Sequence, residues 1–357
     1  MTEYILAEVK GGVGHLILNR PNALNALSFE MIEALSKHLD VFERDPNVHV
    51  ILLTSASEKA FCAGGDVKSI AIAAHEHQTA GGDPQVFQDF FRHEYMLNTR
   101  IFNCEKPFVS LIDGICMGGG VGLSMHGSHR VITERASFAM PEVKIGFFPD
   151  VGGGYLLSRL KQGMGAYLAM TGLRIGAADM MYLGLGTHFM DSGAIDHLVQ
   201  NLITMDWGRS DVHSVLNATL SNYCEDQIPE SSLSQHKGEI NHVFQNEDFD
   251  HILSSLSEGK SDWSQDTLGM VNQACPLSAR IAFDHIQACD GRDFEDVMID
   301  EYRLSQFFMM QSDFYEGVRA VLIDKDHSAK WESRFETLDS KTYQDALSHF
   351  DGQDLAV

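Results

Sequence analysis

Residues 141–155 read PEVKIGFFPDVGGGY, and this stretch says most about the chain. Its two acids, Glu142 and Asp150, each stand directly after a proline, and a glycine-rich run follows at once. Proline fixes its own φ and keeps the residue before it extended, so both acids sit on constrained backbone between apolar residues. The pattern predicts two carboxylates that are held in fixed directions.

Two more glycine turns lie upstream, FCAGGD at residues 61–66 and ICMGGGVG at residues 115–122. Glycine has no Cβ, so a substrate can approach the main-chain N–H groups of such turns closely. Two N–H donors that converge on one oxygen form an oxyanion hole. We expect residues 118–120 to open a helix. The dipole of that helix would add to the electrostatic stabilisation of the bound oxygen.

Two further blocks stand near the ends of the chain, NRPNALNAL at residues 19–27 and DFYEGVRAVLIDKD at residues 313–326. With all these blocks, in this order, the chain resembles the crotonase (enoyl-CoA hydratase/isomerase) superfamily, and within it the 3-hydroxyisobutyryl-CoA hydrolases. The resemblance implies an α/β fold, a crotonase-like spiral of ββα turns with a mainly helical C-terminal region. It also implies hydrolysis of an acyl-CoA thioester, 3-hydroxyisobutyryl-CoA of valine catabolism, with no cofactor because coenzyme A is part of the substrate.

The resemblance also assigns roles to single residues. Glu142 and Asp150 match catalytic positions, and Gly65 and Gly119 match the two main-chain donors of the oxyanion hole. Four further positions are implied to bind substrate: Glu94, Gly64, Asp66 and Gly118. Glu142 could attack the thioester carbonyl or deprotonate a water, and Asp150 could bind the substrate's 3-hydroxyl or share a proton with Glu142.

Two positions separate hydrolysis from hydration within this family. A hydratase-like pattern carries a second glutamate three residues after the glycine matched by Gly119, and here that residue is Gly122. Hydratases usually have glycine where this chain has Asp150. Both differences favour a hydrolase; the alternatives are an enoyl-CoA hydratase or isomerase, and a catalytically silent member that binds acyl-CoA.

The 357 residues carry 26 basic and 50 acidic side chains, a net charge of −24. This charge argues against nucleic acid and anionic membranes as partners, because both need clustered lysine and arginine. The expected partner is a small acyl-CoA molecule, and the phosphates of coenzyme A would need a local basic patch, for which Arg20, Lys59 and Lys68 are candidates.

Other sequence features bear on location and metal binding. Six dispersed cysteines without C-x-x-C pairs predict a reducing compartment. The N-terminus reads as a first strand without a signal or transit character, so the expectation is a bacterial cytoplasmic enzyme. No apolar run reaches the length of a membrane span. The motif His75-Glu76-His77 lacks the spacing of metal ligands, so no bound metal is expected.

Hydrophobic periodicity predicts strands at residues 15–18, 48–54 and 108–112, and a helix capped by Ser28 between the first two. Residues 73–85, with glycines and a proline, are predicted to form a surface loop. Past Pro276 the spacing predicts helices over 277–288 and 294–310. The predicted division is an α/β core with the acyl-CoA site at residues 1–205 and a mainly helical region at residues 206–357, through which the protein could form a homo-oligomer.

Overall fold

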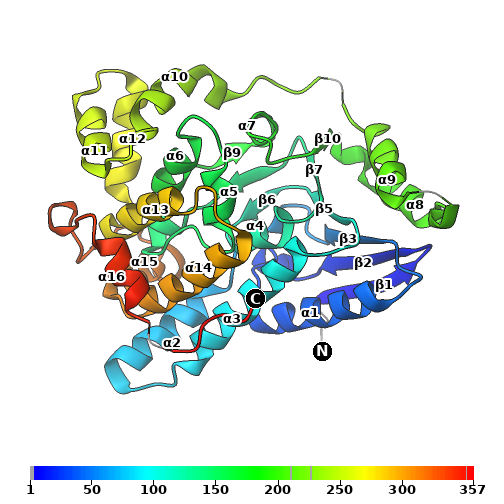
Figure 1. Ribbon diagram of the computed structural model, residues 1–357, viewed down its shortest axis with the longest axis horizontal. Coiled ribbons are helices and arrows are strands. Elements are labelled where there is room, and N and C mark those ends of the chain that lie inside the picture. Colours follow the sequence, from blue (N-terminus) through cyan, green and yellow to red (C-terminus); the bar gives the residue numbers. More distant parts are fainter. Residues whose placement is uncertain (1–3, 210, 226, 351) are drawn as a thin grey trace. The chain divides into compact units, whose positions relative to one another are not determined.

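The computed structural model describes residues 4–209, 211–225, 227–350 and 352–357 (Figure 1). Contacts between Cα atoms divide the chain into two compact units. Unit 1 contains the chain up to Gly65, Leu97–Phe138 and Ile175–Ser234, and unit 2 contains Asp66–Met96, Ala139–Arg174 and Gln235–Val357. The predicted division at residues 205 and 206 follows the order of the chain, whereas each unit gathers segments from three parts of it.

Unit 1 holds a six-stranded sheet in the order β1-β2-β3-β5-β7-β10. Its strands are β1 (Ile5–Lys10), β2 (Val13–Leu18), β3 (Val50–Ser55), β5 (Phe108–Ile112), β7 (His129–Thr133) and β10 (His188–Met190). The β1–β2 pair is antiparallel, and each later neighbour is parallel to the one before it. The three strands predicted from periodicity are confirmed as β2, β3 and β5.

A second, four-stranded sheet has the order β4-β6-β8-β9. Its strands are β4 (Ala60–Cys62), β6 (Ile115–Met117), β8 (Ser137–Ala139) and β9 (Ile175–Gly176). Along the chain, β3, β5 and β7 in the first sheet are each followed by a strand of the second sheet and then by helix. This repeated strand, strand, helix order confirms the predicted α/β spiral of ββα turns.

Helix α1 (Phe29–Arg44) shows how the sequence sets an element of this fold. Ser28 accepts a hydrogen bond from the Met31 N–H and so satisfies one of the free donors at the helix start. The apolar residues of this helix, spaced three or four positions apart along one face, are buried along its whole length: Met31, Ile32, Leu35, Leu39 and Phe42. The prediction of a helix capped by Ser28 is therefore confirmed.

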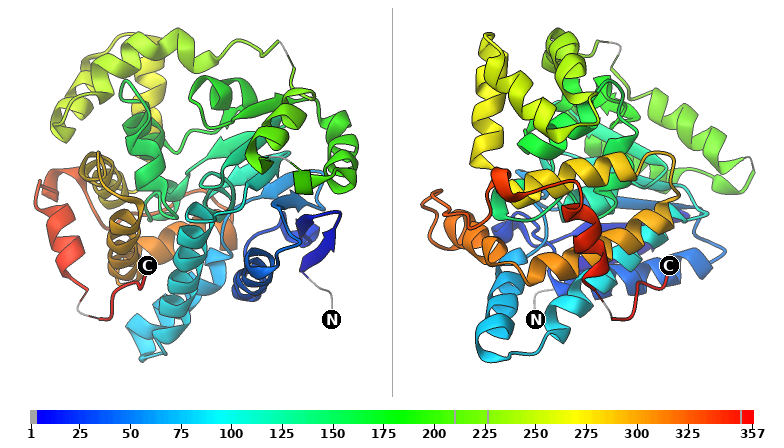
Figure 2. Two further views of the ribbon diagram at one scale, coloured as in Figure 1. Left: turned by 45° about the vertical axis from the view of Figure 1, so that its right-hand side comes forward. Right: turned by 60° about the vertical axis from the view of Figure 1, so that its left-hand side comes forward.

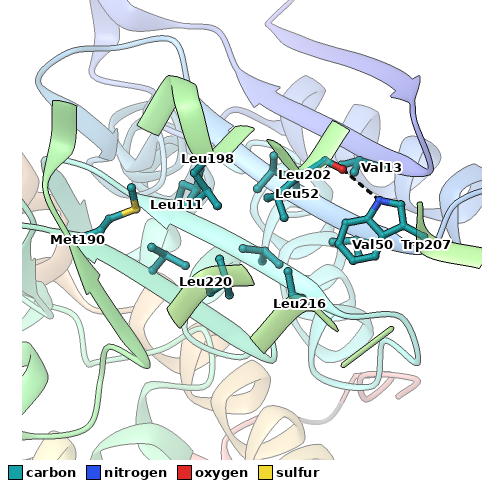
Figure 3. Packing of buried hydrophobic residues seen from close by; sticks show 12 residues of the cluster. Val13, Val50, Leu52, Leu111, Met190, Leu198, Leu202, Trp207, Leu216 and Leu220 are labelled. Carbon is teal, nitrogen blue, oxygen red and sulfur yellow. Dashed lines mark hydrogen bonds between the residues drawn. The ribbon is translucent and has the colours of Figure 1, made fainter. Parts of the chain in front are cut away.

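A hydrophobic core of unit 1 lies between the six-stranded sheet and helices α8 (Ile195–Thr204) and α9 (Val212–Ser221) (Figure 3). Val50, Leu52 and Leu111 from the sheet pack there with Leu198 and Leu220 from the helices. Trp207 joins this core and donates its indole N–H to the Leu202 carbonyl at 3.1 Å (Figure 3). Strands of valine and leucine buried this completely are typical of parallel sheets covered by helices.

The remaining helices follow the predicted pattern of a mainly helical C-terminal region. They are α10 (Ser232–Phe244), α11 (Phe249–Glu258), α12 (Asp262–Gln273), α13 (Pro276–Ala288), α14 (Phe294–Met309), α15 (Ser312–Val318) and α16 (Thr342–Ser348). Helices α13, α14 and α16 contact one another, and α13 also contacts the short helices α5 (Gly153–Ser158) and α6 (Met164–Thr171); Figure 2 shows them from two further sides. Short elements complete the chain: α4 (Gly119–Ser124), α7 (Ala177–Tyr182), the π-helix η5 (Arg319–Ile323), and the 3-10 turns η1 (Pro21–Ala23), η2 (Glu142–Ile145), η3 (Ser192–Ala194), η4 (Trp207–Arg209) and η6 (Phe335–Thr337).

The predicted surface loop at residues 73–85 is wrong. Most of it belongs to helix α2 (Val67–Ala80), which buries Ile70, Ala71 and Ala74. Gly81 ends this helix with φ +70°, a left-handed conformation that suits glycine, and α3 (Gln85–Phe102) begins four residues later. The glycines therefore mark a short connection between two helices. Within the described part of the chain, no helix is long and apolar enough to cross a membrane.

Candidate active site

The two glycine turns of unit 1 leave neighbouring parallel strands. Strand β4 pairs with β6 in parallel, with Cys62 opposite Cys116. Gly65 lies three residues beyond Cys62, and Gly119 lies three residues beyond Cys116. Because the carboxyl ends of parallel strands meet at the same edge of a sheet, the pairing brings both glycines to one edge. The sequence-predicted donors are thus neighbours in the structure.

Each turn needs glycine for a physical reason. Gly118 has φ +47° and ψ −121°, and Gly64 has φ +114°, which are conformations that other residues rarely adopt. Gly119 is the first residue of α4, so its N–H has no acceptor within the helix. A Cβ on Gly120 would lie 2.4 Å from the Cys62 carbonyl oxygen, so the two turns pack without room for a side chain. The predicted helix start is confirmed.

The block at residues 19–27 supports the first glycine turn. Asn25, at φ +55°, donates from its amide to the Phe61 carbonyl at 2.9 Å and accepts from the Arg20 N–H at 2.8 Å. Leu27 donates to the Gly64 carbonyl at 2.8 Å and pairs with Gly65 in an isolated bridge. This block therefore fixes β4 and the turn that follows it. Asp66, the next residue, occupies the N-cap position of α2 in unit 2.

Three buried carboxyl groups of unit 2 form an acid cluster, which we define as Glu94, Glu142 and Asp150. Their exposed fractions are 2%, 6% and 6%. Glu94 comes from α3, Glu142 opens the turn η2, and Asp150 lies just before the glycine run that leads into α5. The structure thus brings together the three acids that the sequence singled out.

Burial is the main influence on the acid cluster. It raises the pKa of Glu142 and of Glu94 well above the usual glutamate value, and the nearby Asp150 charge raises both further. Burial also raises the pKa of Asp150 to about 7, although a hydrogen bond from Tyr95 opposes this rise. Close carboxyl groups hold protons jointly, so the cluster retains at least one proton near neutral pH.

Two oxygens of the acid cluster are buried without a partner. Among the residues that the structure describes, neither Glu94 Oε1 nor Glu142 Oε2 has a hydrogen-bond donor within reach. An unpaired buried acceptor costs about 1–3 kcal/mol, and a catalytic role is one of the reasons for which proteins retain such a cost. These oxygens are suited to meet a substrate or a water.

Tyr95 is a member of this site that the sequence analysis missed. Its phenol donates to Asp150 Oδ2 at 2.7 Å, and its side chain is fully buried. Burial and the neighbouring carboxylates, Asp150 above all, raise the pKa of Tyr95 well above its usual value, so it stays a protonated donor. Tyr95 directly follows Glu94, but an aromatic residue in an amphipathic helix looks like ordinary core, and no local pattern marks it as a donor.

Glu301 of α14 is the second residue that the sequence analysis missed. It is fully buried and accepts hydrogen bonds from the N–H groups of Gly152 and Gly154. A signal was present in the sequence: Glu301 lies in the apolar stripe of the helix, four residues after Val297 and three before Leu304, which are both fully buried. An acid in such a stripe needs buried partners.

The block at residues 313–326 backs the turn that carries Glu142. A Cβ on Gly317 would lie 2.3 Å from the Ile145 carbonyl carbon, and one on Gly146 would lie 2.3 Å from the Asp313 carbonyl oxygen. Asp313 is itself buried and accepts from the Glu332 and Ser333 N–H groups at 2.6 and 3.1 Å. Two glycines thus let the backbone of α15 touch the backbone of η2.

Other reactive side chains have ordinary structural surroundings. Cys62 is fully buried, and its thiol lies 3.1 Å from the Asn25 carbonyl oxygen, as expected for a side chain that packs in the core. His75 stacks on Tyr315 with 3.9 Å between ring centroids. Over the described ranges, no group of three or more His, Cys, Asp or Glu side chains has the geometry to hold a metal ion.

The chain belongs to the enoyl-CoA hydratase/isomerase family, whose model matches residues 13–350. Its relatives include the mitochondrial 3-hydroxyisobutyryl-CoA hydrolase of Gallus gallus, 43% identical over 92% of this chain and 84% of the relative. The mitochondrial 3-hydroxyisobutyryl-CoA hydrolase of Homo sapiens is 41% identical over 98% of this chain and 88% of its own length. The names of these relatives contradict the expected bacterial cytoplasmic location, and that prediction is wrong.

Solved structures with the same fold carry names for another reaction. A carnitinyl-CoA dehydratase from Mycobacterium thermoresistibile is 32% identical, with a TM-score of 0.89 and 99% of both chains covered. An enoyl-CoA hydratase from Rhodobacter sphaeroides 2.4.1 is 31% identical, with a TM-score of 0.88, 99% of this chain covered and 100% of its own. The fold is therefore shared by hydrolases and hydratases, and the choice between them depends on the residues of the site.

Proposed function

We propose that this protein hydrolyses 3-hydroxyisobutyryl-CoA to 3-hydroxyisobutyrate and coenzyme A, a step of valine catabolism. The observation that carries the proposal is the acid cluster: Asp150 stands where hydratases usually have glycine, is buried, and contributes to the raised pKa of Glu142. The relatives named as 3-hydroxyisobutyryl-CoA hydrolases support the same substrate.

The proposed reaction needs a stabilised oxyanion and an attacking group. The N–H groups of Gly65 and Gly119 bind the thioester oxygen as negative charge develops on it, an interaction that contributes about 2.7–4 kcal/mol per donor in enzymes of known mechanism. Glu142, whose Oε2 has no protein partner among the described residues, supplies the attack. Substrate contacts come from Glu94, Gly64, Asp66 and Gly118.

Glu142 can act by either of two routes. In the covalent route, Glu142 attacks the carbonyl carbon, the carbon–sulfur bond breaks, and water then hydrolyses the mixed anhydride. In the other route, Glu142 removes a proton from water as the water attacks the same carbon. Both routes need Glu142 in its ionised form, so the proton that the acid cluster retains near neutral pH must lie on another carboxyl group when the reaction starts. Asp150, whose pKa is about 7, can hold that proton and pass it to the departing thiolate. Asp150 is also suited to bind the 3-hydroxyl group.

Hydration of an enoyl-CoA is the second reaction to consider, because structural neighbours carry that name. The chain has Gly122, buried in α4, where a hydratase-like pattern has its second glutamate. Without that carboxylate, one of the two groups that would hold the attacking water is missing. The site residues therefore support hydrolysis over hydration.

The test is a comparison of two substrates on the purified protein. With 3-hydroxyisobutyryl-CoA we expect steady release of free thiol, and with crotonyl-CoA no loss of the enoyl absorbance. Loss of enoyl absorbance without thiol release would support the hydratase instead. Binding of both substrates without either reaction would identify the catalytically silent member of the family.

A further inference from the structure

Glu301 holds the backbone that follows Asp150. Its Oε2 accepts from the Gly152 N–H at 2.7 Å, and its Oε1 accepts from the Gly154 N–H at 2.9 Å. These N–H groups belong to the start of α5. The cap residue of this helix is Gly152, which has no side chain to make the usual capping hydrogen bond. Glu301, which stands 149 positions after Gly152 in the chain, therefore caps α5 from α14.

A buried chain of polar groups holds Glu301 in turn. His285 Nε2 of α13 lies 3.3 Å from Glu301 Oε1, and His285 Nδ1 lies 3.1 Å from the Tyr343 hydroxyl of α16. Burial alone would lower the pKa of His285, but Cys289, Tyr343 and Glu301 together raise it well above its usual value. A buried carboxylate is tolerated only when it is paired and hydrogen-bonded, and Glu301 has three such partners.

The segment between Asp150 and Gly154 is strained and tightly packed. Val151 has φ +54°, a left-handed conformation that costs a β-branched residue on the order of 1–3 kcal/mol. A Cβ on Gly154 would lie 2.4 Å from His285 Nε2. Such strain persists only where surrounding groups fix the backbone, and the two hydrogen bonds to Glu301 lie directly after the strained residue.

We propose that Glu301 is a positioning residue for the reaction: its carboxylate, held by His285, fixes the segment 150–154 and thereby the direction of the Asp150 side chain. This inference rests on the proposed hydrolase function. The charge of Glu301 also acts electrostatically on Asp150 and Glu142. Burial is the largest cause of the raised pKa values of Asp150 and Glu142, and the Glu301 charge raises both further.

Two variants separate the effect of the length of the Glu301 side chain from the effect of its charge. Glu301→Gln keeps the length of the side chain, removes the charge and leaves one acceptor oxygen for two N–H donors. We expect kcat to fall about tenfold or more, the size of effect of a lost hydrogen bond to a charged group. Because the charge that raised the pKa of Glu142 and Asp150 is gone, the acid limb of the kcat profile, set by ionisation of Glu142, and the alkaline limb, set by proton loss from Asp150, should both move to lower pH.

Glu301→Asp keeps the charge and shortens the reach. We expect a lower kcat with the acid limb close to its wild-type position, because the charge stays and the hydrogen bonds lengthen. Asp296→Asn is the matched control: it removes a charge from an exposed position of the same helix and should change neither kcat nor the profile.

A purely structural role would lower the amount of folded protein and leave the pH profile of the remaining enzyme unchanged; that result, or wild-type kcat in Glu301→Gln, would overturn the proposal. A second readout needs no turnover: urea unfolding of wild type and Glu301→Gln from pH 5 to pH 8. We expect the loss of stability with rising pH to be smaller in the variant, because the pKa of Asp150 falls toward its ordinary value. An equal pH dependence of stability in the two proteins would contradict the proposal, even if the wild type released no thiol. Absence of thiol release alone would count only against the hydrolase function.

Discussion

The phenol of Tyr95 donates a 2.7 Å hydrogen bond to Asp150 Oδ2, and the two side chains are 0% and 6% exposed. This bond stabilises the charged form of Asp150 and opposes the effect of burial on its pKa. Tyr95 and Glu301 therefore act on Asp150 in opposite senses, since the hydrogen bond favours the carboxylate and the Glu301 charge disfavours it.

Tyr95→Phe should shift the pH profile in the direction opposite to Glu301→Gln. Without the phenol, the pKa of Asp150 rises above about 7, so the alkaline limb of kcat, where Asp150 loses its proton, should move to higher pH. We expect kcat at neutral pH to fall about tenfold, as for a lost hydrogen bond to a charged acceptor. Tyr182→Phe, at a 42% exposed position, is the control and should behave as wild type. A shift of the Tyr95→Phe limb to lower pH would contradict the assignment of Tyr95 as donor.

Asp150→Asn should stabilise the folded protein above neutral pH. The pKa of Asp150 rises from 3.8 to about 7 on folding, so the native state binds more protons than the unfolded state between these values. Stability is then highest below the unfolded pKa and falls as pH rises through the folded pKa, by about 1.4 kcal/mol for each pH unit between the two pKa values. Urea unfolding should show the variant more stable by a few kcal/mol at pH 8 and equal to wild type near pH 4. A variant that is less stable at pH 8 would show that Asp150 has a structural role.

Gly119→Ala should damage turnover more than stability. Alanine is a better helix former than glycine, so the first turn of α4 should tolerate it, but we expect the added Cβ to press toward the proposed thioester or to shift the donor N–H. Loss of one oxyanion donor costs about 2.7–4 kcal/mol, or roughly 100-fold to 1,000-fold in kcat. The measurement is kcat beside the thermal midpoint, and a stable variant with full kcat would rule out the donor role.

Gly317→Ala should lower both turnover and stability, because the backbone of α15 contacts the turn that carries Glu142. The new Cβ would lie 2.3 Å from the Ile145 carbonyl carbon, so helix or turn must shift. We expect a destabilisation of about 1–3 kcal/mol, as for overpacked interiors, together with a lower kcat. Gly269→Ala on α12 is the control, since a Cβ there meets nothing within 4 Å. Unchanged stability and kcat in Gly317→Ala would show that the contact carries no constraint.

Local patterns predicted a large part of this architecture. The stripe of α1, the cap at Ser28 and strand β5 at residues 108–112 each follow from residues close together in the chain. The same is true of the glycine turns, whose special conformations only glycine adopts at low cost. Helix α2 was mistaken for a loop because its connection to α3 carries two glycines and a proline, and these residues are typical of loops.

The missed site residues depend on partners far away in the chain. Tyr95 meets Asp150 across 55 positions, and Glu301 meets Gly152 across 149. No periodicity records which donor will face which acceptor once separate elements pack together. Glu142 and Asp150 could be singled out because their own neighbours, prolines and glycines, restrict the backbone on which they stand.

The most direct test of this account is thiol release from 3-hydroxyisobutyryl-CoA by wild type and by Glu142→Gln. The variant keeps the shape of the side chain and removes the carboxylate, so we expect the wild type to release thiol steadily and the variant to be slower by at least about 100-fold, the range of a lost catalytic base or nucleophile. Both proteins should unfold cooperatively, which shows that the loss is chemical. Thiol release by Glu142→Gln at a near wild-type rate would contradict the central role of Glu142.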